Sequence, residues 1–179
     1  MALLVAALLI AGCGGDDDEG GEPGGTSAPA PDAAVFESDE VGFTFQYPEG
    51  FAAETKPDGQ VLGQVSVEPE ADLNAIKIRK TADQELGPER YLDEFQRDFA
   101  RTVGQVDKRE DTVGDLELGV LEFEDSVDQR GKPVEFTSTS YFFSGGGKTW
   151  QVECIADSEH SAEIDAACRG ALETVDFKA

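Results

Sequence analysis

The stretch Thr149-Trp150-Gln151-Val152-Glu153-Cys154-Ile155-Ala156, together with the apolar stripe that follows it, decides the fold. Alternate residues of a strand share one face, and here that face carries Trp150, Val152, Cys154 and Ala156. The stripe has helical spacing and consists of Ile164, Cys168, Leu172 and Val175. The sequence therefore predicts a strand and then a helix that packs on it, with Asp157 or Ser158 as the helix cap.

The chain before this unit repeats the same kinds of pattern from Val35 onward. Period-two patterns predict strands at 35–38, 43–47, 61–67, 75–80, 106–113, 116–123 and 133–143, with turns at 57–59 and 145–147. In one of these strands Ile76 and Ile78 point inward, and Lys77 and Arg79 point outward. Pro88 opens an amphipathic helix of about four turns, with an apolar side of Leu92, Phe95, Phe99 and Val103. Strands, helix, strands and helix in this order predict an α+β domain, an antiparallel β-sheet with helices packed on it.

The chain has three cysteines, Cys13, Cys154 and Cys168. An odd count calls for an explanation in an exported protein. Cys154 and Cys168 are both predicted to point into the layer between the helix and the sheet. In an oxidising compartment they are expected to form a disulfide, and two buried free thiols are the alternative.

Cys13 lies at the end of an apolar N-terminal segment. Ala2 to Ala11 is uncharged and has the length of a signal-peptide core, well short of the roughly 20 residues that span a bilayer. No Lys or Arg follows Met1, so the positive region that normally precedes such a core is missing, and a start codon upstream of Met1 would supply it. The sequence Ile10-Ala11-Gly12-Cys13 resembles the lipobox of bacterial lipoprotein signal peptides. The resemblance implies that 1–12 is a signal peptide and that Cys13 carries acyl chains such as palmitate.

A long polar stretch follows Cys13. Residues 13–34 are rich in Gly, Pro, Asp and Glu and contain no bulky apolar side chain. Such a segment cannot recover the entropy cost of ordering, so 13–34 is predicted to be a disordered tether between the lipidated cysteine and a domain at 35–179.

The net charge of the chain is −24, from 38 acidic and 14 basic residues. Nucleic acid is held mainly by Lys and Arg on its phosphates, so this charge argues against a nucleic-acid partner. An anionic membrane surface would also repel so acidic a protein, so membrane contact is expected through the lipid anchor and not through a basic patch. The acidity can serve solubility alone, and the alternative is a cationic or metal-bearing partner.

The folded part resembles PsbP-like domains. The opening Phe36 to Pro48, with Gly-Phe-Thr-Phe-Gln-Tyr-Pro, is similar to the opening of that family. The central helix and the ending, with Cys154, Ile164, Cys168, Leu172 and Val175-Asp176-Phe177, are similar to its close. The resemblance implies an α-β-α sandwich that bacterial lipoproteins of the LpqN and DcrB kind also have. It implies a binding or assembly role and supplies no catalytic residues.

Few residues are candidates for catalysis. Glu122 and Glu124 alternate on one face of a strand, where paired carboxylates could serve acid–base work or hold a cation. Asp157, Ser158 and His160 are the residue types of a hydrolytic triad, but at the start of a helix they are expected to splay apart. His160 is the only histidine, which limits a metal site, and no cofactor is expected.

These observations predict a membrane-anchored envelope lipoprotein, not an enzyme, on the extracytoplasmic side of the cell membrane. Its domain is expected to bind an envelope protein or a small-molecule ligand. The alternative is an envelope hydrolase or a metal-binding enzyme that uses acidic residues.

Overall fold

The computed structural model describes residues 33–56, 59–69, 71–102, 105–129 and 131–178, without the side chains at 94 and 98–102. The predicted signal peptide, the predicted lipidation site Cys13, almost all of the predicted tether and the turn residues 57 and 58 lie outside this description. In chain order the elements are β1 Ala33–Phe36, β2 Phe43–Pro48, β3 Ala52–Thr55, β4 Gly63–Ser66, β5 Ala75–Ala82, α1 Pro88–Thr102, β6 Asp107–Val113, β7 Leu116–Gln129, β8 Lys132–Gly145, β9 Lys148–Asp157, α2 Ser161–Glu173 and β10 Asp176–Phe177.

The strands form two sheets. The large sheet has the order β3-β4-β5-β9-β8-β7-β6, and the small one has the order β1-β2-β10. Every described pair of neighbouring strands is antiparallel, from β1 with β2 to β8 with β9. The predicted antiparallel sheet is confirmed.

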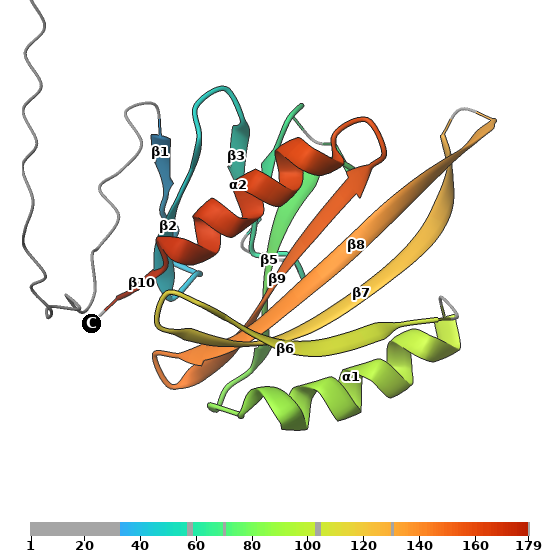
Figure 1. Ribbon diagram of the computed structural model, residues 1–179. Coiled ribbons are helices and arrows are strands. Elements are labelled where there is room, and N and C mark those ends of the chain that lie inside the picture. Colours follow the sequence, from blue (N-terminus) through green and yellow to red (C-terminus); the bar gives the residue numbers. More distant parts are fainter. Residues whose placement is uncertain (1–32, 57–58, 70, 103–104, 130, 179) are drawn as a thin grey trace, which may run out of the picture.

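Helices cover both faces of the large sheet. α2 and the small sheet lie on one face, and α1 lies on the other, under β6, β7 and β8 (Figure 1). Each face has its own apolar core. The core under α2 contains Phe43, Trp150 and Ile164, and the core under α1 contains Tyr91, Leu92 and Phe142. The fold is therefore the predicted α-β-α sandwich. None of the described helices is long and apolar enough to cross a lipid bilayer.

The α1 helix begins where the sequence places it. Pro88 occupies the first helical position, where its missing N–H costs nothing, and Glu89 lies in the first turn. Leu92 is buried against Gly119 of β7, and a Cβ on this glycine would lie 3.1 Å from the Leu92 Cγ. The predicted contacts of Phe99 and Val103 lie outside the described residues.

Several strands differ from their predicted bounds. β1 begins at Ala33, so two residues assigned to the tether belong to the small sheet. The strand predicted at 61–67 is only four residues long. β7 extends to Gln129, well past its predicted end at 123, and β8 ends at Gly145, two residues past its predicted end at 143. The sequence did not predict β3 or β10. Both are short, and each is held by its neighbour, β4 and β2 respectively, and not by a strong pattern of its own.

The prediction for the start of the last helix was wrong. α2 begins at Ser161, and its N-cap is His160, whose side chain makes no capping hydrogen bond. Asp157 instead accepts hydrogen bonds from the backbone N–H groups of Glu159 and His160, at 3.0 Å each. The aspartate thus closes a turn between β9 and the helix, which delays the helix by one turn.

Candidate functional site

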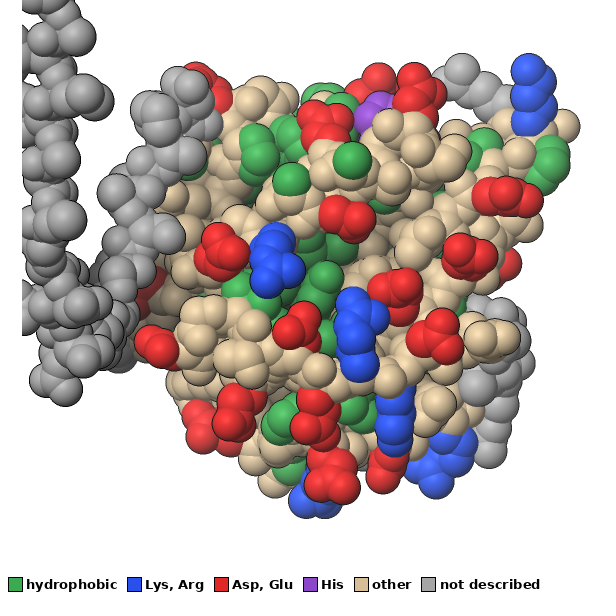
Figure 2. Space-filling view, in the orientation of Figure 1, with side chains coloured by type: hydrophobic (Ala, Val, Ile, Leu, Met, Phe, Trp, Pro, Cys, Tyr) green, Lys and Arg blue, Asp and Glu red, His purple; other side chains and the backbone are tan. Residues whose placement is uncertain are grey.

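A groove of about 540 Å³ lies between α2 and the large sheet. It opens near the centre of Figure 2, where apolar side chains show between charged ones. The sheet supplies the floor and α2 supplies one wall. The lining residues are Arg109, Asp111 and Val113 of β6, Glu122 of β7, Thr137, Thr139 and Tyr141 of β8, Cys154 and Ala156 of β9, and Ser161, Asp165, Ala166, Arg169 and Leu172 of α2.

Charged pairs sit along the rim of this groove. The Arg109 Nη1 atom lies 3.1 Å from the Glu122 Oε2 atom, which joins the edge strand β6 to β7. On the helix side, the Arg169 Nε atom lies 3.5 Å from the Glu173 Oε1 atom. The two arginines of the groove are thus already neutralised by acids of the same protein.

Tyr141 lies partly buried on the sheet side of the groove, and Asp165 lies exposed on the α2 wall. Burial is the main cause that raises the pKa of the Tyr141 hydroxyl, so this group stays a hydrogen-bond donor at neutral pH. Burial also raises the pKa of Asp165, and the negative charge of Glu122 adds to the effect. The negative charges of Asp165 on α2 and Glu122 on β7 therefore repel each other across the groove, although Glu122 is paired with Arg109.

The two predicted acids, Glu122 and Glu124, lie in different surroundings and do not act as a pair. Both alternate along β7, as predicted, but Glu122 is paired with Arg109 at the rim of the groove, while Glu124 is exposed further along the strand. In the residues that the structure describes, no group of three or more His, Cys, Asp or Glu side chains is placed to hold a metal ion.

Asp157, Ser158 and His160 were expected to lie apart, but two of them, Asp157 and His160, are in contact. The Asp157 Oδ1 atom lies 2.8 Å from the His160 Nδ1 atom. Asn74, at a left-handed φ of 56°, donates from Nδ2 to Asp157 Oδ2 at 2.9 Å and accepts from the Asp157 N–H at 3.0 Å. Ser158 lies instead beside the β7–β8 hairpin, where it lines a separate hollow with Glu135. The three residues do not form a hydrolytic relay.

Both partners of this contact have shifted pKa values. Burial opposes ionisation of Asp157, but hydrogen bonds from Asn74 and His160 outweigh it and lower the pKa to about 2. The hydrogen bond to Asp157 raises the pKa of His160 above its usual 6.5. The stabilising effect of the charged histidine is complete below pH 6.5 and is lost as the pH rises through the folded-state pKa. The stabilising effect of the charged Asp157 carboxylate is complete above pH 3.8 and is lost as the pH falls towards 2.

We expect the His160→Gln variant to be less stable than the original protein at pH 5.5 and to approach it at pH 8.5. The midpoint of thermal unfolding, measured for both proteins at the two pH values, tests this. Comparing the two proteins at each pH cancels the general effect of the acidic net charge. A difference that stays constant between pH 5.5 and 8.5 would contradict the pairing of His160 with Asp157.

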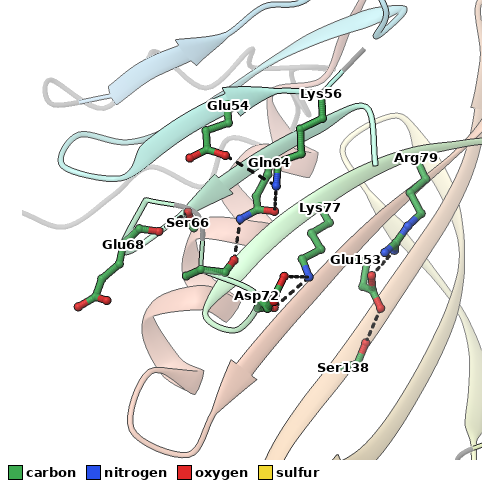
Figure 3. A network of polar contacts seen from close by, with 11 residues as sticks. Glu54, Lys56, Gln64, Ser66, Glu68, Asp72, Lys77, Arg79, Ser138 and Glu153 are labelled. Atoms are coloured by element: carbon green, nitrogen blue, oxygen red, sulfur yellow. Dashed lines mark hydrogen bonds and ion pairs between the residues drawn. The ribbon is translucent and has the colours of Figure 1, made fainter. Parts of the chain in front are cut away.

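The opposite face of the large sheet carries a polar network that the sequence did not predict (Figure 3). Lys77 and Arg79 were expected to point into solvent, and only part of each is exposed. Arg79 pairs with the buried carboxylate of Glu153 on β9, whose other oxygen accepts a hydrogen bond from Ser138 Oγ at 3.1 Å. Lys77 donates to the Asp72 carbonyl oxygen at 2.9 Å, and burial is the main cause that lowers its pKa.

This network extends to the loop that follows β4. Gln64 is almost fully buried and donates from Nε2 to the Ala71 carbonyl oxygen at 2.6 Å. Its Oε1 atom accepts from Lys56 Nζ at 3.2 Å. These bonds hold the loop over the sheet, so we assign the network to structure. The sequence signal that could have revealed this network is that the outward positions of these strands carry Gln and Ser as well as charged residues.

Cys154 and Cys168 are joined in a disulfide between β9 and α2. Their Cα atoms lie 6.3 Å apart, within the usual range for disulfides. Both cysteines are buried, and Cys154 lies on the floor of the groove. The bond therefore fixes the wall of the groove to its floor.

Replacing both cysteines by alanine is expected to lower the free energy of unfolding by about 3 kcal/mol, because the bond closes a loop of about 15 residues in the unfolded chain. Denaturant unfolding of the Cys154→Ala/Cys168→Ala variant measures this loss. A reductant should destabilise the original protein and leave the double variant unchanged. Two free thiols at these positions in the denatured, exported protein would contradict the disulfide.

Comparisons with known proteins support the fold. Neither a protein-family model nor a curated protein matches the sequence. Among solved structures, a crystal structure from Bacteroides thetaiotaomicron VPI-5482 has a TM-score of 0.56 at 13% identity and covers 81% of this chain. The chain spans about half of that protein, 48% of its length.

Two further structures match over most of their own length. The solution structure of cyanobacterial PsbP (CyanoP) from Synechocystis sp. PCC 6803 has a TM-score of 0.52 at 10% identity, and covers 85% of this chain and 96% of its own. LpqN, described as involved in cell envelope biogenesis of Mycobacterium tuberculosis, has a TM-score of 0.51 at 12% identity. The match covers 82% of this chain and 91% of LpqN. At these identities the likeness is one of fold. The folded part of the chain therefore has the same fold as CyanoP and LpqN, the fold of PsbP-like domains.

Proposed function

We propose that the protein is an extracytoplasmic lipoprotein whose folded domain is a non-catalytic binding module. In this proposal acyl chains on Cys13 hold it at the cell membrane, and residues 13–32 separate the membrane from the domain. The lipobox at 10–13 supports the anchor. The likeness to LpqN, a protein described as involved in cell envelope biogenesis, supports the location.

The groove between α2 and the sheet is the observation that carries the binding role. It combines apolar surface, hydroxyl groups and charges, which is the usual composition of a ligand site. Its two arginines are each paired with a neighbouring acid, at 3.1 and 3.5 Å.

Replacing Cys13 by serine is expected to move the protein from the membrane fraction to the soluble or secreted fraction. Serine has no thiol to accept the acyl group, and stable anchoring takes more than one acyl chain. Fractionation of cells that express the original protein and the Cys13→Ser variant measures the shift. The Cys168→Ser variant is the matched control and should stay with the membrane. A Cys13→Ser protein that remains fully membrane-bound would refute the anchor.

A further inference from the structure

The floor of the groove can bury an apolar group. Val113, Cys154, Ala156 and Leu172 all line it, and they belong to the packed core, so the floor is apolar and only a small part of each side chain reaches the groove. The floor is fixed on one side by the strands β8 and β9 and on the other by the disulfide to α2. A ligand with an apolar stem therefore meets a preformed surface, which lowers the cost of binding.

The charges around the Tyr141 hydroxyl are unbalanced. Four charged groups act on it, namely Arg109 and the three carboxylates of Asp111, Glu122 and Asp165. Arg109 pairs with Glu122 at 3.1 Å, so one positive charge faces three negative ones. Within the described part of the chain, neither Asp111 nor Asp165 forms an ion pair. This part of the groove therefore carries an excess of negative charge.

The remaining arginine of the groove does not correct this excess. Arg169 lies one turn beyond Asp165 on α2, and its Nε atom turns to Glu173 at 3.5 Å. Asp111 accepts a hydrogen bond from the backbone N–H of Thr112 at 2.8 Å, which leaves its negative charge in place. Asp165 is exposed on the groove wall, and desolvation and the negative charge of Glu122 both raise its pKa, so a cation placed between the two carboxylates relieves repulsion that is already present.

The geometry also favours a particular kind of cation. The carboxylates come from β6, β7 and α2, on opposite sides of the groove, and hydroxyl groups of Thr139 and Tyr141 lie on its floor. An ammonium group has three N–H donors to share among such acceptors. The ring of Tyr141 can also attract a cation that lies over its face.

We propose that this groove binds an organic ammonium ion carried on an apolar stem. The ammonium group lies between Asp165, Asp111 and Tyr141, and the stem lies on the floor formed by Val113, Ala156 and Leu172. This inference rests on the proposed function and gives the ligand of the same groove a chemical class.

Three probes with the same stem test the proposal: hexylammonium, 1-hexanol and hexanoate. Amide chemical shifts of the isotope-labelled protein are followed as each probe is added, and the shifts give both the site and the affinity. We expect hexylammonium to bind tightest, hexanol more weakly and hexanoate weakest, with shifts in β8, β9 and α2. The Asp165→Asn variant should weaken hexylammonium about fivefold or more and leave hexanol unchanged, and Asp111→Asn should act in the same direction.

Two controls separate this site from general attraction to an acidic protein. Asp176→Asn removes an exposed acid outside the groove and should not change the affinity for hexylammonium. Ala166→Trp fills the groove from α2 and should abolish binding of all three probes. Ala162→Trp, at an exposed position on the same helix outside the groove lining, should not.

The possible failures are distinguishable. If hexanol or hexanoate binds in the groove as well as hexylammonium does, the ammonium inference is wrong and the groove remains a binding site. If no probe binds, or if Ala166→Trp binds all three like the original protein, the assignment of the groove as the binding site fails too. Equal weakening by Asp165→Asn and Asp176→Asn would show attraction by the net charge alone and would overturn the inference.

Discussion

Replacing Phe43 by alanine is expected to lower the free energy of unfolding by about 3–5 kcal/mol, the usual loss for a fully buried aromatic side chain. Phe43 lies on β2 and is completely buried. Its ring contacts four other aromatic rings, at centroid distances between 5.3 and 6.1 Å. Those rings come from the small sheet and from β8 and β9, so the substitution opens a cavity where the two sheets meet.

Chemical denaturation of the Phe43→Ala variant measures this loss. Phe43→Leu keeps an apolar side chain in the same place and should lose clearly less. Val35→Ala, at an exposed position on β1, should change the stability by less than about 0.5 kcal/mol. A Phe43→Ala protein as stable as the Val35→Ala protein would contradict the packing described for this core.

Replacing Glu153 by alanine is expected to cost about 3 kcal/mol, at the lower end of the range for breaking a buried ion pair. The carboxylate of Glu153 is 9% exposed and pairs with Arg79, whose side chain is 26% exposed. Without it, the guanidinium group stays partly buried with no counter-charge, and Ser138 loses the acceptor of its hydrogen bond. The exposure of Arg79 to water keeps the loss from being larger.

An exposed ion pair gives the matched control. Glu122→Ala breaks the pair with Arg109, in which both side chains are at least 40% exposed, and should cost less than about 1 kcal/mol. The double variant Arg79→Met/Glu153→Leu, which replaces both charges by apolar groups, should recover much of what Glu153→Ala loses. Equal losses for Glu153→Ala and Glu122→Ala in the same denaturation experiment would show that the Arg79 pair is not effectively buried.

The elements predicted well from the sequence are those with a strong period of their own. Alternation from Trp150 to Ala156 identified β9, and Pro88 with Leu92 and Phe95 identified α1. The missed strands lack such a signal. Residues 52–55 contain only two small apolar side chains, and 176–177 are too few to show alternation. Their strands exist because neighbouring strands supply the hydrogen bonds.

The groove could not be predicted because its residues are far apart in the sequence. Arg109 and Asp165 belong to different elements, and only the pairing of β6 with β7 and the placement of α2 bring them to one place. Lys77 and Arg79 were misplaced for another reason. Charged residues that alternate with Ile76 and Ile78 indicate a solvent-facing side. The sequence did not show that β9, which is distant along the chain, would lie beside β5 and pair Glu153 with Arg79.

The pairing of β10 with β2 has a consequence for how the chain reaches this structure. Thr174 Oγ1 accepts a hydrogen bond from the Gln46 N–H across 128 positions, and Lys178 Nζ donates to the Ser38 carbonyl oxygen across 140. Such contacts give a high contact order, which slows folding because long loops must close before the contacts form. The small sheet is incomplete until residues 174–178 have been synthesised. In the export proposed above, the small sheet would therefore be completed only after residues 174–178 have followed the rest of the chain across the membrane.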